Sequence, residues 1–263
     1  SAEKIEELTQ TVDTLTDFPA IIDAGKKILP GLILPDDGHV FLLGDFAAIE
    51  ARGIAYLAGC SQLLEQFAAG KDIYTEMAKR INSAKPNRQL GKAVILGCGY
   101  GMGVNKFYDT CMKWGIEVDR AMAEQAVKAY RAQYAEIPAF WYGLERAFRD
   151  CWNTKQPQRV GKYIAMERGS NFIKIALPSG RRLFYHQIQI DPRTNEISHF
   201  SFSRKMRVHI YGGILAENVT QAMCRDILVD RIMELEKRGI GVKMHVHDEA
   251  VAKLDRQGFR KQD

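Results

Sequence analysis

The sequence predicts a helix-rich α+β fold, and three observations support this class. Apolar residues recur at helical spacing through most of residues 49–153. Residues 156–211 change character and consist of short apolar strands separated by turns. The chain then continues with a long helix followed by a strand, a tight turn and a second strand. With 263 residues, it is long enough for one large domain or two smaller ones with a sizeable core.

The first half is expected to contain one strand and a succession of helices. Helical spacing defines the helices, and Gly and Pro residues mark their ends. In chain order the expected elements are one or two polar helices within 1–29, a strand at Val40–Leu43 that ends at Gly44-Asp45, and helices over Ile49–Ala58, 63–82, Arg88–Leu96 and most of 104–153, with interruptions at Pro86, Gly115 and Pro138.

The second half is expected to contain short strands, one long helix and a closing hairpin. Pro178-Ser179-Gly180 is a typical turn between strands, and Gly239 is a favourable carboxyl-terminal cap for the helix. The expected strands are Tyr163–Ala165, Phe172–Ala176, Arg182–Ile190 and His199–Ile210, the helix is Ile214–Arg238, and the hairpin joins Gly241–Val246 to Ala250–Leu254 through His247-Asp248-Glu249.

Composition excludes several classes of protein. A hydrophobic content of 46% is too high for a disordered chain. The sequence has no run of 18 apolar residues, which excludes a transmembrane helix, and its first residues lack the layout of a secretory signal. Five scattered cysteines without a C-x-x-C pair argue against a zinc site or a disulfide framework and favour a reducing cytoplasm. A net charge of +5 is compatible with a nucleic-acid partner without requiring one.

Asp45 is the first candidate for chemistry. It ends an apolar strand where the chain turns into a helix, a position that can present a carboxylate to the floor of a cleft. Mg²⁺ prefers one or two such oxygens together with waters and substrate phosphates. The alternative is a helix cap, because Asp is also favoured at strand-to-helix turns.

The second candidate is the segment His245-Val246-His247-Asp248-Glu249, at the tip of the closing hairpin. Two adjacent acids there would be costly to desolvate unless a cation is present. One alternative is a transition-metal site, because His245 and His247 would point to one face of a strand. The other is a solvated turn.

The third candidate is the helix that begins at Arg88. Helical geometry keeps Arg88, Lys92 and Leu96 within roughly 80° of one face, and places the two cations roughly 6 Å apart along the axis. That spacing suits successive phosphates of a triphosphate. The alternative is a solvated basic face. The glycines nearby spell neither a G-x-G-x-x-G nor a Walker A motif, so a Rossmann or P-loop nucleotide site is poorly supported.

The order of these segments resembles motifs A, B and C of family A DNA polymerases. Residues 45–52 read D-x-x-x-x-E-x-R, residues 88–101 read R-x-x-x-K-x-x-x-x-x-x-x-Y-G, and residues 247–249 read H-D-E. Three further segments agree with this family: Asp72-Ile73-Tyr74, Gly180-Arg181-Arg182-Leu183 and Tyr211-Gly-Gly-Ile-Leu-Ala-Glu-Asn-Val-Thr-Gln221. The sequences of residues 45–52 and 211–221 are most similar to the phage and prophage branch of the family.

The resemblance covers about residues 30–255 and implies a right-hand fold. The palm, a small antiparallel sheet with helices, would comprise residues 30–52 and 211–263, and mainly helical fingers would comprise 53–210. Residues 1–29 would be a remnant that precedes the palm. Only 44 residues precede Asp45 and 15 follow Asp248, so we expect a fragment that lacks the thumb and the proofreading exonuclease.

The resemblance also implies a two-metal nucleotidyl transfer from dNTPs to a primer on a DNA template. Asp45 and Asp248 would hold two Mg²⁺ ions, with Glu249 as the adjacent, less critical acid. Lys92 would contact the triphosphate and is a candidate general acid for pyrophosphate, and Arg88 would hold the outer phosphate. No membrane partner and no oligomer is implied.

The remaining implied positions surround the nucleotide and the DNA. Glu50 would be the steric gate that excludes ribonucleotides, and Tyr100 would close against the nascent base pair. The residues expected to touch DNA are Arg52, Gln221 and His247. The sequence departs from the common family pattern at four positions. In the nucleotide site, Leu96 stands where many relatives have Phe or Tyr, and Tyr74 stands where His is common. Ala48 and His245 stand where glutamines are common.

Two alternatives share this fold. One is a single-subunit RNA polymerase relative, against which Glu50 and Glu249 count, because that class lacks the glutamate gate and has a small residue after its His-Asp pair. The other is a catalytically incompetent polymerase remnant that binds nucleic acid. The intact set of Asp45, Asp248, Arg88 and Lys92 argues against decay.

Overall fold

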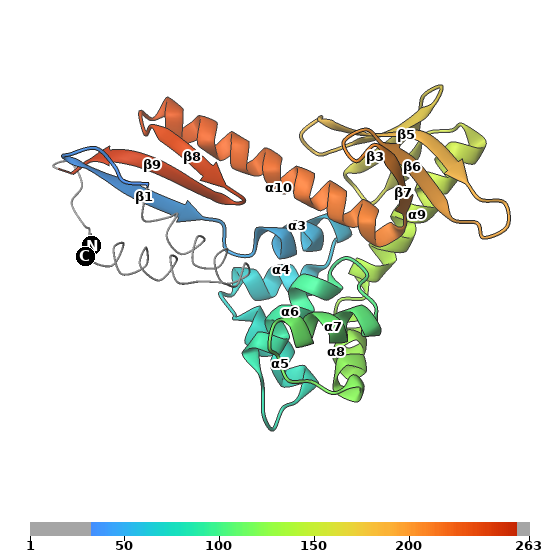
Figure 1. The fold of residues 1–263 in the computed structure, drawn as a ribbon, viewed down its shortest axis with the longest axis horizontal. Helices are drawn as coiled ribbons and strands as arrows, with labels where there is room; N and C mark the ends of the chain where they lie inside the picture. Colours follow the sequence, from blue (N-terminus) through green and yellow to red (C-terminus); the bar gives the residue numbers. More distant parts are fainter. Residues whose placement is uncertain (1–32, 257–263) are drawn as a thin grey trace, which may run out of the picture. The chain divides into compact units, whose positions relative to one another are not determined.

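The computed structural model describes residues 33–256, which divide into two compact units. Unit 1 combines the chain up to Asp45 with the chain from Asp230 onward, and unit 2 is Phe46–Val229. The polar helices and the remnant expected within residues 1–29 lie outside the described residues. Figure 1 labels most of the elements of both units.

Unit 1 is built on a three-stranded antiparallel sheet in the order β1-β9-β8. The strands are β1 (His39–Asp45), β8 (Val242–Val246) and β9 (Glu249–Asp255). The expected strand near the amino terminus and the expected hairpin are therefore both present. A long register joins β1 to β9, from His39 opposite Asp255 to Asp45 opposite Glu249. Residues far apart in sequence thus meet at one end of this sheet.

Unit 2 contains most of the helices. The expected helices over Ile49–Ala58 and from Arg88 onward are present. In chain order the helices are α3 (Ile49–Ala58), α4 (Ser61–Ala68), α5 (Ile73–Ile81), α6 (Arg88–Cys98), α7 (Val104–Lys113), α8 (Arg120–Gln133), α9 (Glu136–Thr154) and α10 (Gly212–Lys237), the last of which continues into unit 1.

Two expectations about these helices were wrong. The single helix expected over 63–82 is two helices, because Asp72 caps the second one by accepting hydrogen bonds from the backbone N–H groups of Tyr74 and Thr75. Pro138 does not interrupt a helix but lies in the first turn of α9. The first turn has no intrahelical partners for its N–H groups, so a proline there sacrifices no hydrogen bond.

A six-stranded antiparallel sheet, in the order β2-β3-β4-β5-β6-β7, forms the rest of unit 2. Strands β4 and β5 have the expected limits. The strand expected over His199–Ile210 is instead a hairpin of two strands, and β2 was not expected. The strands are β2 (Gln158–Val160), β3 (Ile164–Arg168), β4 (Phe172–Ala176), β5 (Arg182–Ile190), β6 (Ile197–Ser201) and β7 (Met206–Ile210).

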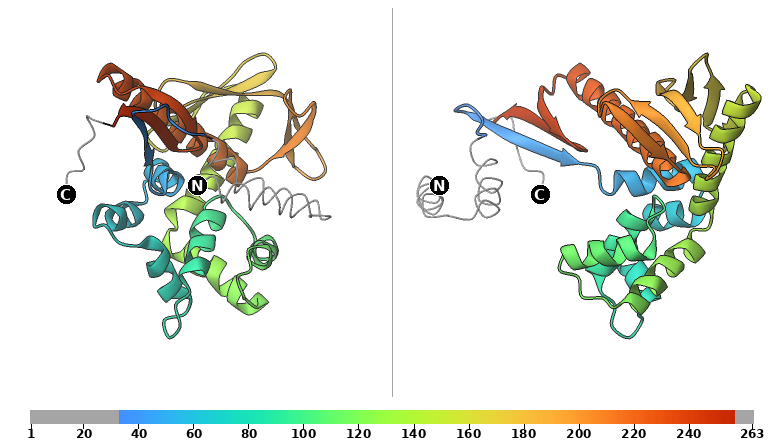
Figure 2. Two further views of the ribbon diagram at one scale, coloured as in Figure 1. Left: turned by 60° about the vertical axis from the view of Figure 1, so that its left-hand side comes forward. Right: turned by 45° about the vertical axis from the view of Figure 1, so that its right-hand side comes forward.

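One face of this sheet, the inner face, packs on helices. Tyr185 of β5 makes an edge contact with Phe148 of α9, with ring centroids 5.4 Å apart, and its hydroxyl accepts a hydrogen bond from Asn218 of α10. Figure 2 shows α9 running beside the sheet in both views. The sheet and the helices therefore share one apolar core, and the opposite face of the sheet is left to solvent.

Glycines allow the helices of unit 2 to pack closely on one another. A Cβ at Gly91 of α6 would lie 2.0 Å from the carbonyl oxygen of Tyr74 in α5. A Cβ at Gly53 of α3 would lie 2.9 Å from the Sγ of Cys224 in α10. Both separations are far shorter than van der Waals contact, so neither pair of helices could pack this closely with a larger residue.

Two further features concern the cysteines and the helices. All five cysteines are buried, and none forms a disulfide. Among the helices of residues 33–256, none has the length and the apolar run needed to cross a bilayer.

Gly91→Ala is expected to destabilise the protein, because the added methyl group meets a backbone carbonyl that cannot move without separating α5 from α6. Overpacking of this kind lowers the free energy of unfolding by about 1–3 kcal/mol, which urea denaturation measures. Gly97→Ala in the same helix is the matched control, because the tightest contact of its Cβ would be with the flexible end of Met102, at 3.2 Å, and its contact with Phe107, at 3.8 Å, is of ordinary length. Equal stability of the two variants would contradict this account.

Candidate active site

Three acids gather at one end of the sheet in unit 1. Asp45 is the last residue of β1 and lies directly opposite Glu249, the first residue of β9. Asp248 directly precedes Glu249, in the two-residue turn between β8 and β9. Asp45 is exposed, and the other two are half-buried. The structure therefore places at one end of this sheet the three acidic residues that the sequence analysis assigned to metal binding.

The charge arrangement at this end fits a hard divalent cation. Like charges directly opposite each other on neighbouring strands destabilise a sheet, and Asp45 and Glu249 are such a pair. Mg²⁺ is bound in proteins by one or two carboxylates plus water and phosphate rather than by a full cage. Among the described residues, no group of three or more His, Cys, Asp or Glu side chains is placed to hold a metal ion by itself.

The histidines of the hairpin do not share a strand face. His245 lies in β8 opposite Ala250, whereas His247 is beyond the end of β8, in the turn. His247 has a φ of 52°, in the left-handed region that L-residues rarely adopt. The alternative of a transition-metal site needed both imidazoles on one face, so this alternative was wrong.

Arg88, the first residue of α6, is held by the acid that caps α5. Its Nε donates to Oδ2 of Asp72 at 2.6 Å, and its guanidinium lies 5.2 Å from the centroid of the Tyr74 ring. This hydrogen bond is the largest cause that lowers the pKa of Asp72, to about 2. The Arg88 side chain is nevertheless half exposed. It is therefore preorganised next to Tyr74 and still open to an anion.

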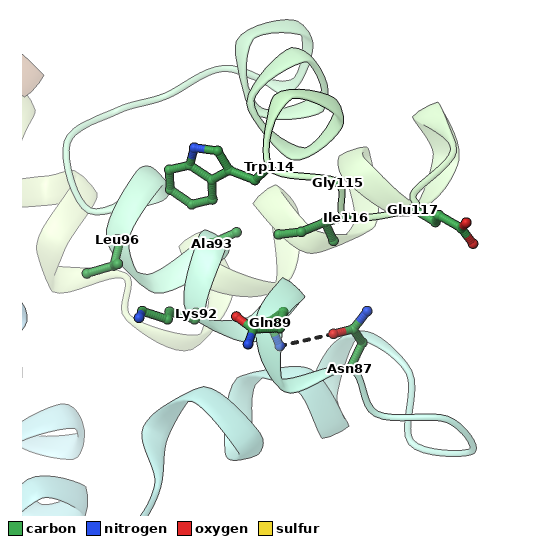
Figure 3. Close-up of a pocket in the computed structure, with 9 residues that line it drawn as sticks. All are labelled: Asn87, Gln89, Lys92, Ala93, Leu96, Trp114, Gly115, Ile116 and Glu117. Atoms are coloured by element: carbon green, nitrogen blue, oxygen red, sulfur yellow. Dashed lines mark hydrogen bonds between the residues drawn. The ribbon is translucent and has the colours of Figure 1, made fainter. Parts of the chain in front are cut away.

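Lys92 and Leu96 line a cavity of about 690 Å³ beside α6. Figure 3 shows the indole of Trp114, from the segment after α7, across from Leu96 and Ala93, with the carboxylate of Glu117 turned away from α6. Leu96 is 38% exposed and Trp114 is 55% exposed. The cavity thus combines a cation with apolar and aromatic surface. Its lining is Asn87, Gln89, Lys92, Ala93, Leu96, Trp114, Gly115, Ile116 and Glu117.

Glu50 is held between two other candidate residues. Its carboxylate accepts a hydrogen bond from the hydroxyl of Tyr100 at 3.3 Å and another from the amide of Gln221 at 3.3 Å. Burial raises the pKa of Tyr100 well above its usual value, and the Glu50 carboxylate raises it further. The tyrosine hydroxyl therefore stays protonated and remains a donor. These bonds join α3, the end of the α6 segment and α10.

The backbone around Tyr100 is fixed by the start of α10. A Cβ at Gly213 would lie 2.1 Å from the carbonyl oxygen of Tyr100, and one at Gly212 would lie 2.2 Å from that of Trp141. The Trp141 indole donates to the carbonyl oxygen of Gly99 at 2.7 Å. The two glycines after Tyr211 are thus required for the close approach that positions Tyr100.

Arg52 already has partners within unit 2. Its Nε donates to the carbonyl oxygen of Ala47 at 2.9 Å, and its guanidinium lies 4.1 Å from the centroid of the Phe67 ring. Gln221 is exposed beside Glu50. The candidate residues therefore form two sets, the acids with His247 in unit 1 and the remaining positions in unit 2.

A comparison with protein families decides the family. Residues 7–172 match the family described as DNA polymerase family A. The chain belongs to this family. The resemblance drawn from the motifs is thereby confirmed.

Individual members of the family are longer than this chain. The DNA polymerase of Bacillus phage SP02 is 33% identical over 248 residues, which are 88% of this chain and 38% of the phage protein. DNA polymerase I of Lactococcus lactis subsp. lactis (strain IL1403) is 27% identical over 56% of this chain and 17% of its own length. The chain spans less than two fifths of the length of these relatives.

A solved structure confirms the predicted α+β polymerase fold class. The POL domain of Pol1 from M. smegmatis, in complex with DNA primer-template and dNTP, superimposes with a TM-score of 0.53 at 18% identity. The match covers 88% of this chain and 36% of that chain. At this identity the likeness concerns the architecture rather than individual side chains.

Two residues of the site were missed by reasoning from sequence. Asp72 was noted only as part of a family segment, although the pattern Asp-Ile-Tyr-Thr before a helix is a cap signal. Trp114 was not considered at all, because nothing local links it to α6. Only the packing of the segment after α7 brings it to the cavity.

Mg²⁺ is expected to stabilise the protein through the acids of unit 1. A ligand at about 100 times its dissociation constant adds about 2.7 kcal/mol to the free energy of unfolding, which thermal unfolding with and without MgCl₂ measures. In Asp45→Asn this increment should largely disappear, and the variant without Mg²⁺ should be at least as stable as the parent because the repulsion with Glu249 is removed.

Asp36→Asn is the matched control for this measurement. Asp36 belongs to the same unit but pairs with Lys253, which lowers the pKa of Asp36. This variant should keep the full Mg²⁺ response. A response lost equally in both variants would mean that Mg²⁺ does not bind at the Asp45 end of the sheet.

Proposed function

We propose that this chain carries the palm and fingers of a template-directed DNA polymerase, which transfers a nucleotide from a dNTP to the 3′-hydroxyl of a primer. The observation that carries this proposal is the register of Asp45 with Glu249, because it joins the acids of motifs A and C at one sheet end. Family membership supports the same activity. The palm would comprise residues 30–52 and 211–263, and the fingers 53–210.

Asp45 and Asp248 would hold two Mg²⁺ ions, with Glu249 as an auxiliary acid. When bound, such ions lower the pKa of the primer hydroxyl and neutralise the charge of the leaving pyrophosphate. The carboxylates fit this role because all three are oxygen donors at the end of one sheet, and two face each other directly. The protein's own part is then mainly positioning and charge stabilisation.

The basic edge of α6 would bind the triphosphate. Lys92 lines the cavity beside this helix and would contact the phosphates, and it is the candidate that donates a proton to the leaving pyrophosphate. Arg88 would hold the outer phosphate by exchanging its contact with Asp72 for one with the nucleotide. Tyr74, whose ring lies beside Arg88, and Leu96 would complete the nucleotide site.

Glu50 would select deoxynucleotides. Its carboxylate is fixed by Tyr100 and Gln221, so it cannot easily move aside for a 2′-hydroxyl. Arg52, Gln221 and His247 would contact the primer-template. Contacts of this kind in the minor groove check the shape of a base pair without reading its identity. The buried, unbridged cysteines support a reducing, cytoplasmic location.

Primer extension tests the proposed activity. A labelled primer on a DNA template should grow with dNTPs and Mg²⁺, and Asp248→Ala should abolish growth by removing a proposed metal ligand. Glu50→Ala should admit ribonucleotides that the parent rejects. Equal extension with dNTPs and NTPs by the parent would favour the RNA polymerase alternative. Salt-sensitive DNA binding without extension would favour the non-catalytic alternative.

Asp72→Asn is expected to lower the KM for dNTPs about 3-fold or more, because a neutral amide competes less with phosphate for the Arg88 guanidinium than a carboxylate does. The amide oxygen can still cap α5, so the variant should fold, with a lower stability at neutral pH because the ionic contact with Arg88 is lost. Steady-state kinetics with Arg88→Ala as the opposite control, in which KM rises, checks this. An unchanged KM in both variants would exclude Arg88 from the nucleotide site.

Asp72 should also contribute to the acid stability of the protein. Its folded-state pKa of about 2 lies below the ordinary value of 3.8. The contribution is therefore fully present above about pH 4 and lost as the pH falls toward 2. Urea denaturation across this window should show a smaller loss of stability for Asp72→Asn than for the parent.

A further inference from the structure

The six-stranded sheet carries a continuous group of aromatic rings on its outer face. Phe172 of β4 lies opposite His186 of β5, which in turn lies opposite Phe200 of β6. Side chains that face each other across strands point to the same side of a sheet. Phe184 precedes His186 by two residues and shares this side. We call Phe172, Phe184, His186, Phe200 and Phe202 the aromatic face.

The rings of the aromatic face contact one another in series. Phe184 and His186 are stacked, with centroids 6.1 Å apart and planes 13° apart, and Phe172 lies 5.5 Å from Phe184. Phe202 links His186, at 5.2 Å, to Phe200, at 5.3 Å. The rings therefore form one surface across three strands and the turn that follows β6.

This surface is not part of the core. Phe184 is 49% exposed and Phe202 is 61% exposed. The inner face of the same strands supplies the buried residues that pack on the helices, such as Ile173, Ile175 and Tyr185. A contiguous exposed apolar patch on a soluble domain usually marks an interaction site.

The charges around the aromatic face are mostly positive. Cross-strand registers place Arg159, Lys174, Arg182 and Arg207 on the same side of the sheet, with Glu167 as the acid in register there. Glu167 is already engaged by Lys174 at 2.6 Å. Arg204 and Lys205 add two further exposed cations in the turn between β6 and β7. The net charge of this side therefore favours an anionic partner.

We propose that the aromatic face binds single-stranded DNA. Exposed aromatic rings stack on unpaired bases of any sequence, and neighbouring cations follow the phosphate backbone. Duplex DNA would not use the rings, because its bases already stack on one another. An apolar protein partner would leave the excess of arginine and lysine without compensation. This site is separate from the residues of the candidate active site and does not require nucleotidyl transfer.

Fluorescence anisotropy with the full chain and a labelled oligothymidylate of about 15 nucleotides tests this site. Phe184→Ala combined with Phe202→Ala should weaken binding at least about 10-fold, because each stacked ring contributes substantially to affinity. Arg182→Ala should lower the slope of log affinity against log salt by about 0.7, the loss expected for one phosphate contact with a single strand. Both changes concern exposed side chains, so the variants should remain folded, which thermal unfolding checks.

Tyr142→Ala is the matched control, because Tyr142 of α9 is 61% exposed, as is Phe202. It should bind the oligonucleotide like the parent. Asp248→Asn separates this proposal from the polymerase proposal, because it should lose primer extension and keep the dependence of DNA binding on Phe184 and Phe202. Unchanged affinity of the double variant would overturn the proposal. So would a change confined to self-association in sedimentation, which would indicate that the face pairs two copies of the chain.

Discussion

Backbone contact at glycines is the constraint on which the architecture of unit 2 depends. Gly91 brings α6 against the carbonyl of Tyr74, and Gly213 brings the start of α10 against the carbonyl of Tyr100. Each contact replaces a side-chain layer with direct backbone packing. Because these helices pack so closely, the absence of a side chain at Gly91 and Gly213 determines where Arg88, Tyr100 and Gln221 lie. The glycines thus act on the site through distance, although none of them carries a functional group.

The acidic end of the sheet in unit 1 contains two energetically unfavourable features. Its acids stand opposite each other, and His247 beside them has a left-handed backbone conformation. Both features cost stability in the protein alone. Such costs are typical of sites that are completed by a ligand, and the divalent cation proposed above would offset the repulsion between the carboxylates. The long register between β1 and β9 holds this end of the sheet together despite the repulsion.

On α6 and its neighbours, the candidate nucleotide residues are already engaged with one another. Asp72 holds Arg88, and Glu50 is bonded by both Tyr100 and Gln221. These contacts restrict rotamers before a ligand arrives and so reduce the entropy lost on binding. In the proposed nucleotide site, a phosphate would have to compete with Asp72 for Arg88. The same acid that caps α5 would then control how available the Arg88 guanidinium is.

The outer face of the six-stranded sheet also exposes groups suited to binding an anion, although it lies outside the candidate active site. Alternation along β4, β5 and β6 sends aliphatic residues and Tyr185 inward and aromatic or basic residues outward. A solvent-facing strand would ordinarily show polar residues on that side. The aromatic residues on this side are therefore not explained by the stability of the sheet, and an interaction with a partner explains them better.

The sequence by itself determined the class of fold and several element limits, and it supplied the acids and cations of the candidate site as predictions. Helical spacing and strand alternation are local patterns, and the motif segments are contiguous, so both can be read without tertiary information. Local patterns also misled where capping intervened, as at Asp72, and where a helix start tolerated Pro138.

Only the tertiary structure decided which distant residues meet. Strand pairing placed Asp45 opposite Glu249, backbone packing placed Gly213 against Tyr100, and the segment after α7 placed Trp114 beside Leu96. None of these contacts has a local signal, because each depends on long-range burial and register. The sequence named the chemical groups of the site, and packing determined their partners.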